Sequence, residues 1–277
     1  MAKKALCIGI NNYPGTQMDL QGCVNDANDW AAALTQRGFA VSKLLDSEAT
    51  KAAMMTAMED LIAKASKGDS LVITFSGHGT YQPDTDGDEA DGLDEALCPY
   101  DLQTSGAALT DDEIRVLFAA RKAGVRIVLI SDSCHSGTVT RAAAAERDAD
   151  TRPRFMPMGN WLPDKLLPRN RAGEVASTTV APVGATPLLG AFSNKLGDLL
   201  LAGCKEGPNN FSYDARISGR YNGAFTYYAL KALKMLKADA TYADWHKSIG
   251  KYLPSASYPQ VPQIVGGDAA RKGPIFE

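Results

Sequence analysis

Histidine and cysteine are scarce in this chain of 277 residues, which holds three histidines and five cysteines. The cysteines are odd in number, and no two of them have the Cys-X-X-Cys spacing of zinc ribbons. The sequence therefore predicts neither a disulfide framework nor a structural zinc site, and it favours a reducing, cytoplasmic environment. Because histidine is so rare here, the position of each one is informative.

Long hydrophobic runs and blocks of like charge are also absent. No stretch approaches the roughly 18 apolar residues of a membrane span, and the net charge is −3 with no run of five like charges. We therefore expect neither a membrane nor a nucleic acid as a partner. Met1 to Lys4 leads directly into an apolar strand, which is not the pattern of a signal peptide. The chain can bury a large core, and we expect a soluble monomer.

Apolar runs alternate with helical periodicity along most of the chain. Continuous runs of Val, Ile and Leu are typical of parallel strands buried on both faces, whereas apolar residues at every third or fourth position indicate helices. The alternation predicts an α/β fold, with a mostly parallel sheet of about six strands flanked by helices. The expected strands are 5–10, 39–45, 70–75, 126–130, 196–204 and 262–265, and the expected helices are 20–37, 50–67, 110–123, 223–236 and 242–253.

The alternation stops at residue 138. From there to about residue 187 the chain has an Ala/Arg/Asp stretch followed by six prolines, with no sustained period. A segment of this length without regular structure is typical of a functional or mobile loop. We interpret the chain as a single domain in three parts, namely 1–137, a linker over 138–187, and 188–277.

Two of the three histidines lie in short segments that directly follow buried strands. The segment Ser-Gly-His-Gly contains His78, and Asp-Ser-Cys-His-Ser-Gly contains Cys134 and the second histidine. In open α/β sheets, ligands bind beyond the carboxyl ends of the parallel strands. The sequence therefore predicts that His78 and Cys134 face each other across one cleft.

A thiol and an imidazole in one cleft point to nucleophilic catalysis. The thiolate is the reactive form of cysteine, and a neighbouring imidazole favours it. Gly79 allows the backbone to approach a substrate closely, so its N–H group and that of Cys134 are suited to hold an oxyanion. Cys134 follows His78 by 56 positions, close to the roughly 50 that separate the same pair in caspases.

Both segments resemble metacaspases of the bacterial type, also called orthocaspases. After His78 the chain continues with Tyr-Gln and an acidic stretch that ends at Glu95, as in the histidine region of that family. Further similarity covers 19–26, 199–204 and 223–226, so it includes most of the chain outside the linker. The resemblance implies a caspase-like three-layer sandwich and a cysteine endopeptidase whose chemistry needs no cofactor. The Gln-Ala-Cys signature of true caspases is absent.

Acidic residues near the predicted nucleophile indicate the specificity. A pocket for a basic side chain needs carboxylates, whereas a pocket for aspartate needs arginines. Asp132 precedes Cys134 by two residues. The resemblance places Asp132, Asp26, Cys23 and Ser76 around the residue before the cut, which predicts cleavage of protein or peptide substrates after Arg or Lys. The two aspartates are also consistent with turn caps or an internal ion pair.

The linker is itself rich in basic residues. A protease with the predicted specificity can cut its own linker, or the linker can occupy the cleft. The candidate positions are Arg141, Arg147, Arg152, Arg154, Lys165, Arg169 and Arg171.

Calcium is a further expectation, as an activator. Seven acidic residues lie between Asp84 and Glu95, and carboxylate oxygens suit calcium, although the spacing is not that of an EF-hand. The resemblance implies a site at Asp94, Asp111 and Asp112 with another aspartate several residues past the cysteine. This chain has Arg141 in that region.

Two other functions are open. The chain can be a catalytically latent scaffold or regulator, although both members of the expected Cys/His pair are present. Alternatively, Cys134, His135 and His78 can bind zinc or report the redox state.

Overall fold

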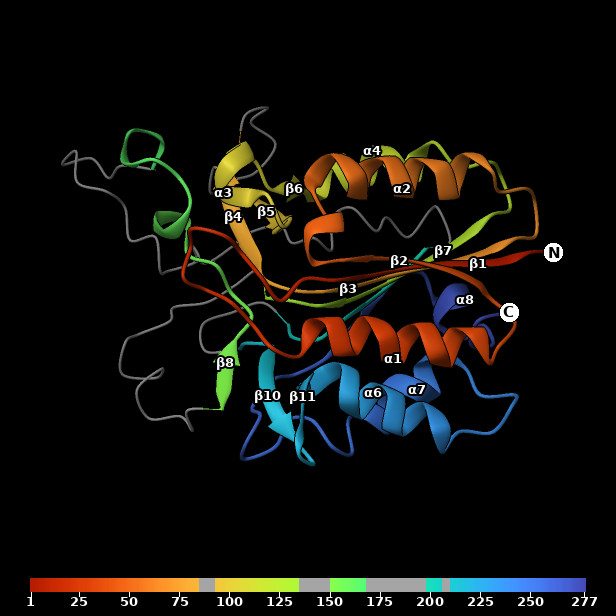
Figure 1. Cartoon of the computed structure of the whole chain (residues 1–277). Helices are drawn as coiled ribbons and strands as arrows, with labels where there is room; N and C mark the ends of the chain where they lie inside the picture. Colours follow the sequence, from red (N-terminus) through yellow and green to blue (C-terminus); the bar gives the residue numbers. More distant parts are fainter. Residues whose placement is uncertain (85–92, 135–149, 168–197, 206–209) are drawn as a thin grey trace.

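A six-stranded sheet runs through the centre of the protein, with helices on both faces (Figure 1). The structure is a computed structural model that describes residues 1–84, 93–134, 150–167, 198–205 and 210–277. In spatial order the strands are β12 (Gln263–Val265), β9 (Leu199–Ala202), β7 (Arg126–Asp132), β3 (Ser70–Ser76), β1 (Lys3–Gly9) and β2 (Ala40–Leu45). Neighbouring strands are parallel, except that β12 is antiparallel to β9. The expected α/β fold with a mostly parallel sheet is confirmed.

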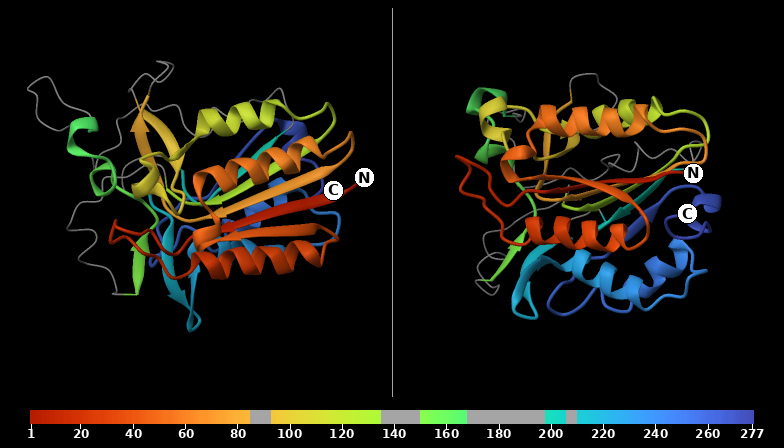
Figure 2. Two further views of the ribbon diagram at one scale, coloured as in Figure 1. Left: turned by 45° about the horizontal axis from the view of Figure 1, so that its top comes forward. Right: turned by 45° about the vertical axis from the view of Figure 1, so that its right-hand side comes forward.

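The helices form two layers. The helices α2 (Lys51–Ala63) and α4 (Asp111–Ala119) lie on one face of the sheet, and α1 (Cys23–Thr35), α6 (Ala224–Lys234) and α7 (Tyr242–Ile249) lie on the other (Figures 1 and 2). The short helices are α3 (Leu102–Ser105) and α8 (Asp268–Arg271). Thr110 and Glu113 form a capping box at the start of α4, close to the start of the helix expected over 110–123. No described helix is both long and apolar enough to cross a membrane.

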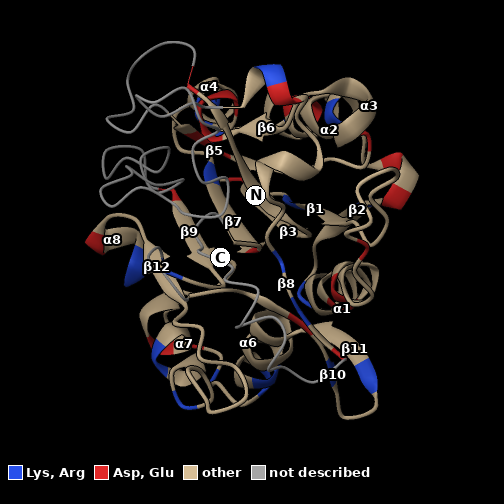
Figure 3. Cartoon of the chain, turned by 90° about the vertical axis from the view of Figure 1, so that its left-hand side faces the viewer, with Lys and Arg blue, Asp and Glu red and all other residues tan. Residues whose placement is uncertain are grey.

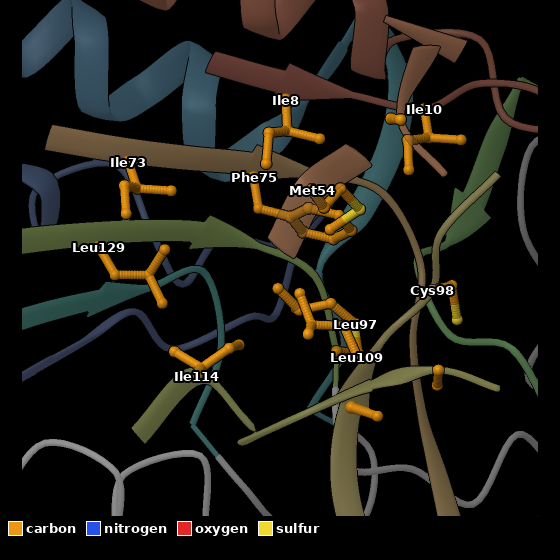
Figure 4. Close-up of a cluster of buried hydrophobic side chains, with 14 of the residues drawn as sticks. Ile8, Ile10, Met54, Ile73, Phe75, Leu97, Cys98, Leu109, Ile114 and Leu129 are labelled. Atoms are coloured by element: carbon orange, nitrogen blue, oxygen red, sulfur yellow. The ribbon is translucent and has the colours of Figure 1, made fainter. Parts of the chain in front are cut away.

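Side chains that point alternately to the two faces of the strands fill a core on each face of the sheet. Ile8, Ile73 and Leu129 point toward the layer of α2 and α4, as Figure 4 shows. Their neighbours Cys7 and Val72 belong to the core on the α1 and α6 side. Successive side chains of a strand point to opposite faces, so a strand that is apolar throughout supplies both cores. This explains why the central strands are continuous apolar runs in the sequence.

Two small sheets stand at the end of the molecule where the parallel strands finish (Figure 1). One contains β4 (Gly79–Pro83), β5 (Leu93–Leu97) and β6 (Leu109–Thr110). The other contains β8 (Thr151–Pro153), β10 (Tyr213–Ile217) and β11 (Arg220–Gly223). Single 3-10 turns lie at Asp46–Glu48, Met158–Asn160 and Asp164–Leu166. The sequence did not predict either small sheet, and both contribute to the site described below.

Candidate active site

The two chemically informative segments leave the sheet side by side. The strands β3 and β7 are adjacent and parallel, and their last residues, Ser76 and Asp132, are partners in the register. His78 therefore follows one strand end and Cys134 the next. The structure therefore places both residues at the same edge of the sheet, and both are buried.

The imidazole of His78 is held from one side by the chain. Its Nε2 lies 2.6 Å from the carbonyl oxygen of Met18. A carbonyl only accepts hydrogen bonds, so Nε2 carries the proton and the neutral ring keeps its lone pair on Nδ1. Nδ1 has no hydrogen-bond partner within the described residues. The ring also contacts Tyr13, whose hydroxyl accepts a 2.8 Å hydrogen bond from the His78 backbone N–H.

Burial keeps this imidazole neutral. Desolvation lowers the pKa of His78 to about 4, despite the opposing hydrogen bond to the Met18 carbonyl. At neutral pH the ring is therefore a base and not an imidazolium. The loop that contains Met18 supplies the orienting group, which the sequence did not identify.

The thiol of Cys134 lies against the start of β10. Its Sγ accepts a hydrogen bond of 2.6 Å from the backbone N–H of Ser212. Cys204 lies close to Cys134. A hydrogen bond with Cys134, together with burial, raises the pKa of the Cys204 thiol well above its usual range. Ser212 also contacts Asp132 through its hydroxyl group. The Cys134 thiol is thus fixed by Ser212, a residue that sequence analysis did not select.

Two backbone N–H groups converge on one carbonyl oxygen, that of Arg154. The N–H of Gly79 donates to it over 3.0 Å and the N–H of Cys134 over 3.1 Å. These are the two donors that the sequence suggests for an oxyanion. Two preorganised N–H groups at this distance can stabilise negative charge that develops on such an oxygen.

The side chain of Arg154 is fully buried among three carboxylates. Its Nη2 donates to Asp26 over 2.7 Å and to Asp214 over 2.9 Å, and its Nη1 lies 3.2 Å from Asp132. Burial lowers the pKa of Arg154, but Asp132 and the other acidic groups outweigh this and raise it above its ordinary value. The guanidinium therefore stays charged, and it satisfies acidic groups that would otherwise repel one another.

Each carboxylate is also held by partners of its own. Asp26 accepts hydrogen bonds of 3.0 Å from the N–H of Gly223, and Asp132 accepts one of 2.9 Å from the N–H of Thr226. Asp214 accepts 2.8 and 2.9 Å bonds from the backbone N–H groups of Gln21 and Gly22. Each of the three acidic groups therefore has backbone N–H partners in addition to Arg154, and together they surround its guanidinium.

The other two predicted pocket residues lie in the same region. Cys23 is the first residue of α1, and burial raises the pKa of its thiol well above the usual range while Arg154 opposes that shift. The hydroxyl of Ser76 is buried at the end of β3, next to Asp132 in the register. Gly223 packs closely against these side chains, since a Cβ atom there would lie 2.1 Å from Asp132 and 2.5 Å from Arg154. Only glycine leaves room for the guanidinium at that position.

The backbone around Arg154 is extended and paired with the site. The strand β8, which ends just before Arg154, is antiparallel to β10, and Figure 3 shows the two side by side. The N–H of Arg154 donates to the carbonyl of Ser212 over 2.9 Å, and the N–H of Met156 donates to the carbonyl of Gly79 over 2.8 Å. A segment of the expected linker is therefore held next to Gly79 and Cys134 as an added strand.

The expected calcium ligands do not form a complete site within the described residues. Asp94 lies in β5 and is buried, Asp111 begins α4, and Asp112 pairs with Arg115. Within those ranges no three His, Cys, Asp or Glu side chains are grouped so that they can hold a metal ion. Arg141 and His135 lie outside the described residues, so the structure does not address their proposed roles.

Comparison with known proteins gives a consistent assignment. A family described as "Metacaspase, peptidase C14 domain" matches residues 3–142. Metacaspase-1A of Aspergillus niger is 31% identical over 291 residues, covering 95% of this chain and 69% of that protein. Metacaspase-1 of Cryptococcus neoformans is 42% identical over 146 residues, covering 49% of this chain and 32% of that protein. This match therefore spans about a third of the length of the fungal protein.

A solved structure agrees over nearly the whole chain. The crystal structure of protein GSU0716 from Geobacter sulfurreducens superposes with a TM-score of 0.70 and 31% sequence identity, covering 99% of this chain and 98% of that one. The sequence matches and the shared fold lead to the same family, and they agree with a thiol and an imidazole at adjacent strand ends. This chain belongs to the metacaspase family of cysteine peptidases.

Proposed function

We propose that this protein is a cysteine endopeptidase that cleaves peptide bonds after arginine or lysine, with Cys134 as the nucleophile and His78 as the general base. The observation that carries the proposal is the binding of Arg154. Its side chain lies among three carboxylates, while its carbonyl oxygen accepts from the N–H groups of Gly79 and Cys134. A purely structural ion pair does not require the second set of contacts, whereas a bound substrate requires both.

The reaction follows from these contacts. The sulfur of Cys134 bonds to the carbonyl carbon, and the electrons of the C=O bond move to the oxygen that Gly79 and Cys134 hold. His78 takes the thiol proton at Nδ1 and passes it to the leaving amine as the C–N bond breaks. Water then hydrolyses the thioester, with His78 again accepting a proton. The Met18 carbonyl keeps the ring in the tautomer that this sequence of steps requires.

The pocket favours arginine over lysine. Both terminal nitrogens of Arg154 have carboxylate partners, and they come from three different segments of the chain. The planar guanidinium can satisfy several acceptors at once, whereas the ammonium of lysine is a compact point charge. We therefore expect lysyl substrates to be cleaved more slowly than arginyl substrates.

Cleavage of the chain's own Arg154–Phe155 bond is the first prediction. Because this bond is already seated at the site, we expect purified protein to convert into two fragments, one ending at Arg154 and one beginning at Phe155. Intact-mass measurement and N-terminal sequencing over time will detect them. We expect Arg154→Gln to stop this cut, because it removes the positive charge. Arg152→Gln is the matched control, since Arg152 is exposed in the same segment.

Two results would contradict that prediction. One is formation of the same fragments at an unchanged rate in Cys134→Ala, which would assign the cut to another protease. The other is a wild-type protein that stays intact and also leaves added arginyl peptides uncut. That second result would favour the alternative function, a latent scaffold in which Arg154 closes the pocket permanently.

A neutral, buried His78 also predicts a pH dependence of stability. Its pKa is about 4 in the folded protein, against 6.5 for an ordinary histidine, so the unfolded chain binds the proton first as the pH falls. Above pH 6.5, the neutral state of buried His78 contributes about 3 kcal/mol to the free energy of unfolding. This contribution is lost as the pH falls toward 4. Urea unfolding of Cys134→Ala with and without His78→Gln will isolate it. Equal losses in both proteins between pH 7 and pH 4 would contradict the prediction.

Calcium activation stays a prediction from the resemblance, and no step proposed here passes through a metal. Peptide hydrolysis measured with calcium and with a chelator will test it. A rate that is equal in both conditions would exclude calcium as an activator, and the proposed roles of Cys134 and His78 would stand.

A further inference from the structure

We propose that the site also recognises the two residues after the cut, and that it selects large apolar side chains at both positions. This inference rests on the proposed peptidase function. It concerns the chain that follows Arg154, namely Phe155 and Met156, and the strand β4 that contacts them.

The backbone of these two residues is held by β4. Phe155 forms a parallel bridge with Gly79, and the N–H of Met156 donates to the carbonyl of Gly79 over 2.8 Å. The hydroxyl of Thr80 donates to the carbonyl of Met156 over 2.7 Å. Gly79 therefore acts on both sides of the bond, because its N–H holds the carbonyl of Arg154 and its C=O holds the second residue beyond it. Main-chain bonds of this kind fix the register of a bound peptide.

The side chains of the same two residues are enclosed. Phe155 is 1% exposed and Met156 is 0% exposed, and both belong to the core on the α2 and α4 side of the sheet. The ring of Phe155 packs edge-on against Tyr81 of β4, with 6.0 Å between the ring centroids. Enclosure of this extent removes most of the apolar surface of both side chains from water. A short polar residue at either position gains little from the same site.

The chain before the cut is bound differently. Arg152 is exposed and its side chain makes a hydrogen bond, from Nη1 to the carbonyl oxygen of Asp19 over 2.8 Å. Thr151 and Pro153 are only half-buried, so β8 is held mainly through its backbone pairing with β10. Backbone pairing is largely independent of sequence. Apart from the arginine itself, the selectivity therefore lies after the cut and not before it. The substrate class is a protein segment in which arginine is followed by two large apolar residues.

Quenched fluorescent peptides test this directly. The reference is Thr-Arg-Pro-Arg-Phe-Met-Pro-Met, the sequence of residues 151–158. One variant replaces Phe-Met by Ser-Ser, and another replaces the leading Thr-Arg by Ala-Ala. We expect kcat/KM to fall about tenfold or more for the Ser-Ser peptide, since two apolar side chains lose their burial. The Ala-Ala peptide should stay within about threefold of the reference, because backbone pairing is retained.

A change in the enzyme provides an independent test. Tyr81→Ala should reduce the ratio of rates between the Phe-Met and Ser-Ser peptides, because it removes the ring that Phe155 contacts. Tyr252→Ala is the matched control, since that ring stacks on Tyr228 and takes no part in the site. Equal hydrolysis of the Phe-Met and Ser-Ser peptides would overturn the inference and leave the peptidase function intact. Failure to cut any of the arginyl peptides would overturn both.

Discussion

Replacement of Cys134 by alanine is expected to lower kcat/KM for an arginyl peptide by about four orders of magnitude or more. The substitution removes the sulfur that we propose bonds to the carbonyl carbon, so the proposed covalent intermediate cannot form. The N–H of residue 134 remains in place, so the contact with the carbonyl oxygen is kept. Binding of the peptide should therefore change far less than the rate of the chemical step.

The matched control for this variant is another buried cysteine. Cys7 lies in β1 and belongs to the core on the α1 and α6 side, away from the cleft. Cys7→Ala should retain most of the activity, and a thermal melt will check that both variants are folded. Residual activity of Cys134→Ala above one hundredth of wild type would mean that another group is the nucleophile.

Neutralising one carboxylate of the pocket is expected to have the second largest effect. Asp26→Asn and Asp214→Asn each remove a charge that lies within 3 Å of Nη2 of Arg154. Truncating one partner of a buried, hydrogen-bonded charge pair costs about 2–5 kcal/mol. We therefore expect kcat/KM for arginyl peptides to fall by about thirtyfold to several thousandfold.

A peptide with a neutral analogue of arginine distinguishes loss of charge recognition from loss of folded enzyme. Citrulline has nearly the shape of arginine without its charge, so the ratio of rates for arginine and citrulline peptides reports the pocket alone. Both substitutions should reduce that ratio. Asp198→Asn is the control, because Asp198 is an equally buried carboxylate paired with Arg121 outside the pocket. An unchanged ratio in Asp26→Asn and Asp214→Asn would exclude these groups from specificity.

The central sheet could be predicted from the sequence because its strands are apolar on both faces. All six expected strands are present, and Thr50 caps α2 as its position suggests. Helix ends were less accurate. The first helix begins at Cys23 and not at residue 20, because the preceding residues form the loop that brings the Met18 carbonyl to His78. The helix expected to extend to residue 253 ends at Ile249.

The small sheets escaped prediction for a different reason. Their strands are short, and the pairing of β8 with β10 joins residues far apart in the chain, although β10 and β11 form a local hairpin. A local signal for β10 was present, since the apolar residues Tyr213, Ala215 and Ile217 stand at alternate positions. No local signal marked Asp214 as a pocket residue, because its role depends on where that pairing places it.

The site shows the same division between local and long-range information. Cys134, His78, Asp26 and Asp132 were found from motifs, and the structure brings them together around Arg154. The linker contained seven basic candidates, and the sequence had no means to rank them. Four of these candidates lie outside the described residues. Among the three that the structure describes, Arg154 is distinguished by the pairing of β8 with β10 and by the two N–H groups at its carbonyl oxygen.

Hydrolysis of three peptides that differ only in the residue before the cut, namely arginine, lysine or aspartate, tests the proposed specificity of the site. The protein should be assayed after its own processing, beside Cys134→Ala. We predict cleavage after arginine, slower cleavage after lysine, none after aspartate, and no activity in the variant. Cleavage after aspartate, or equal cleavage of all three peptides, would contradict the assignment of the acidic pocket and the proposed cleavage after basic residues.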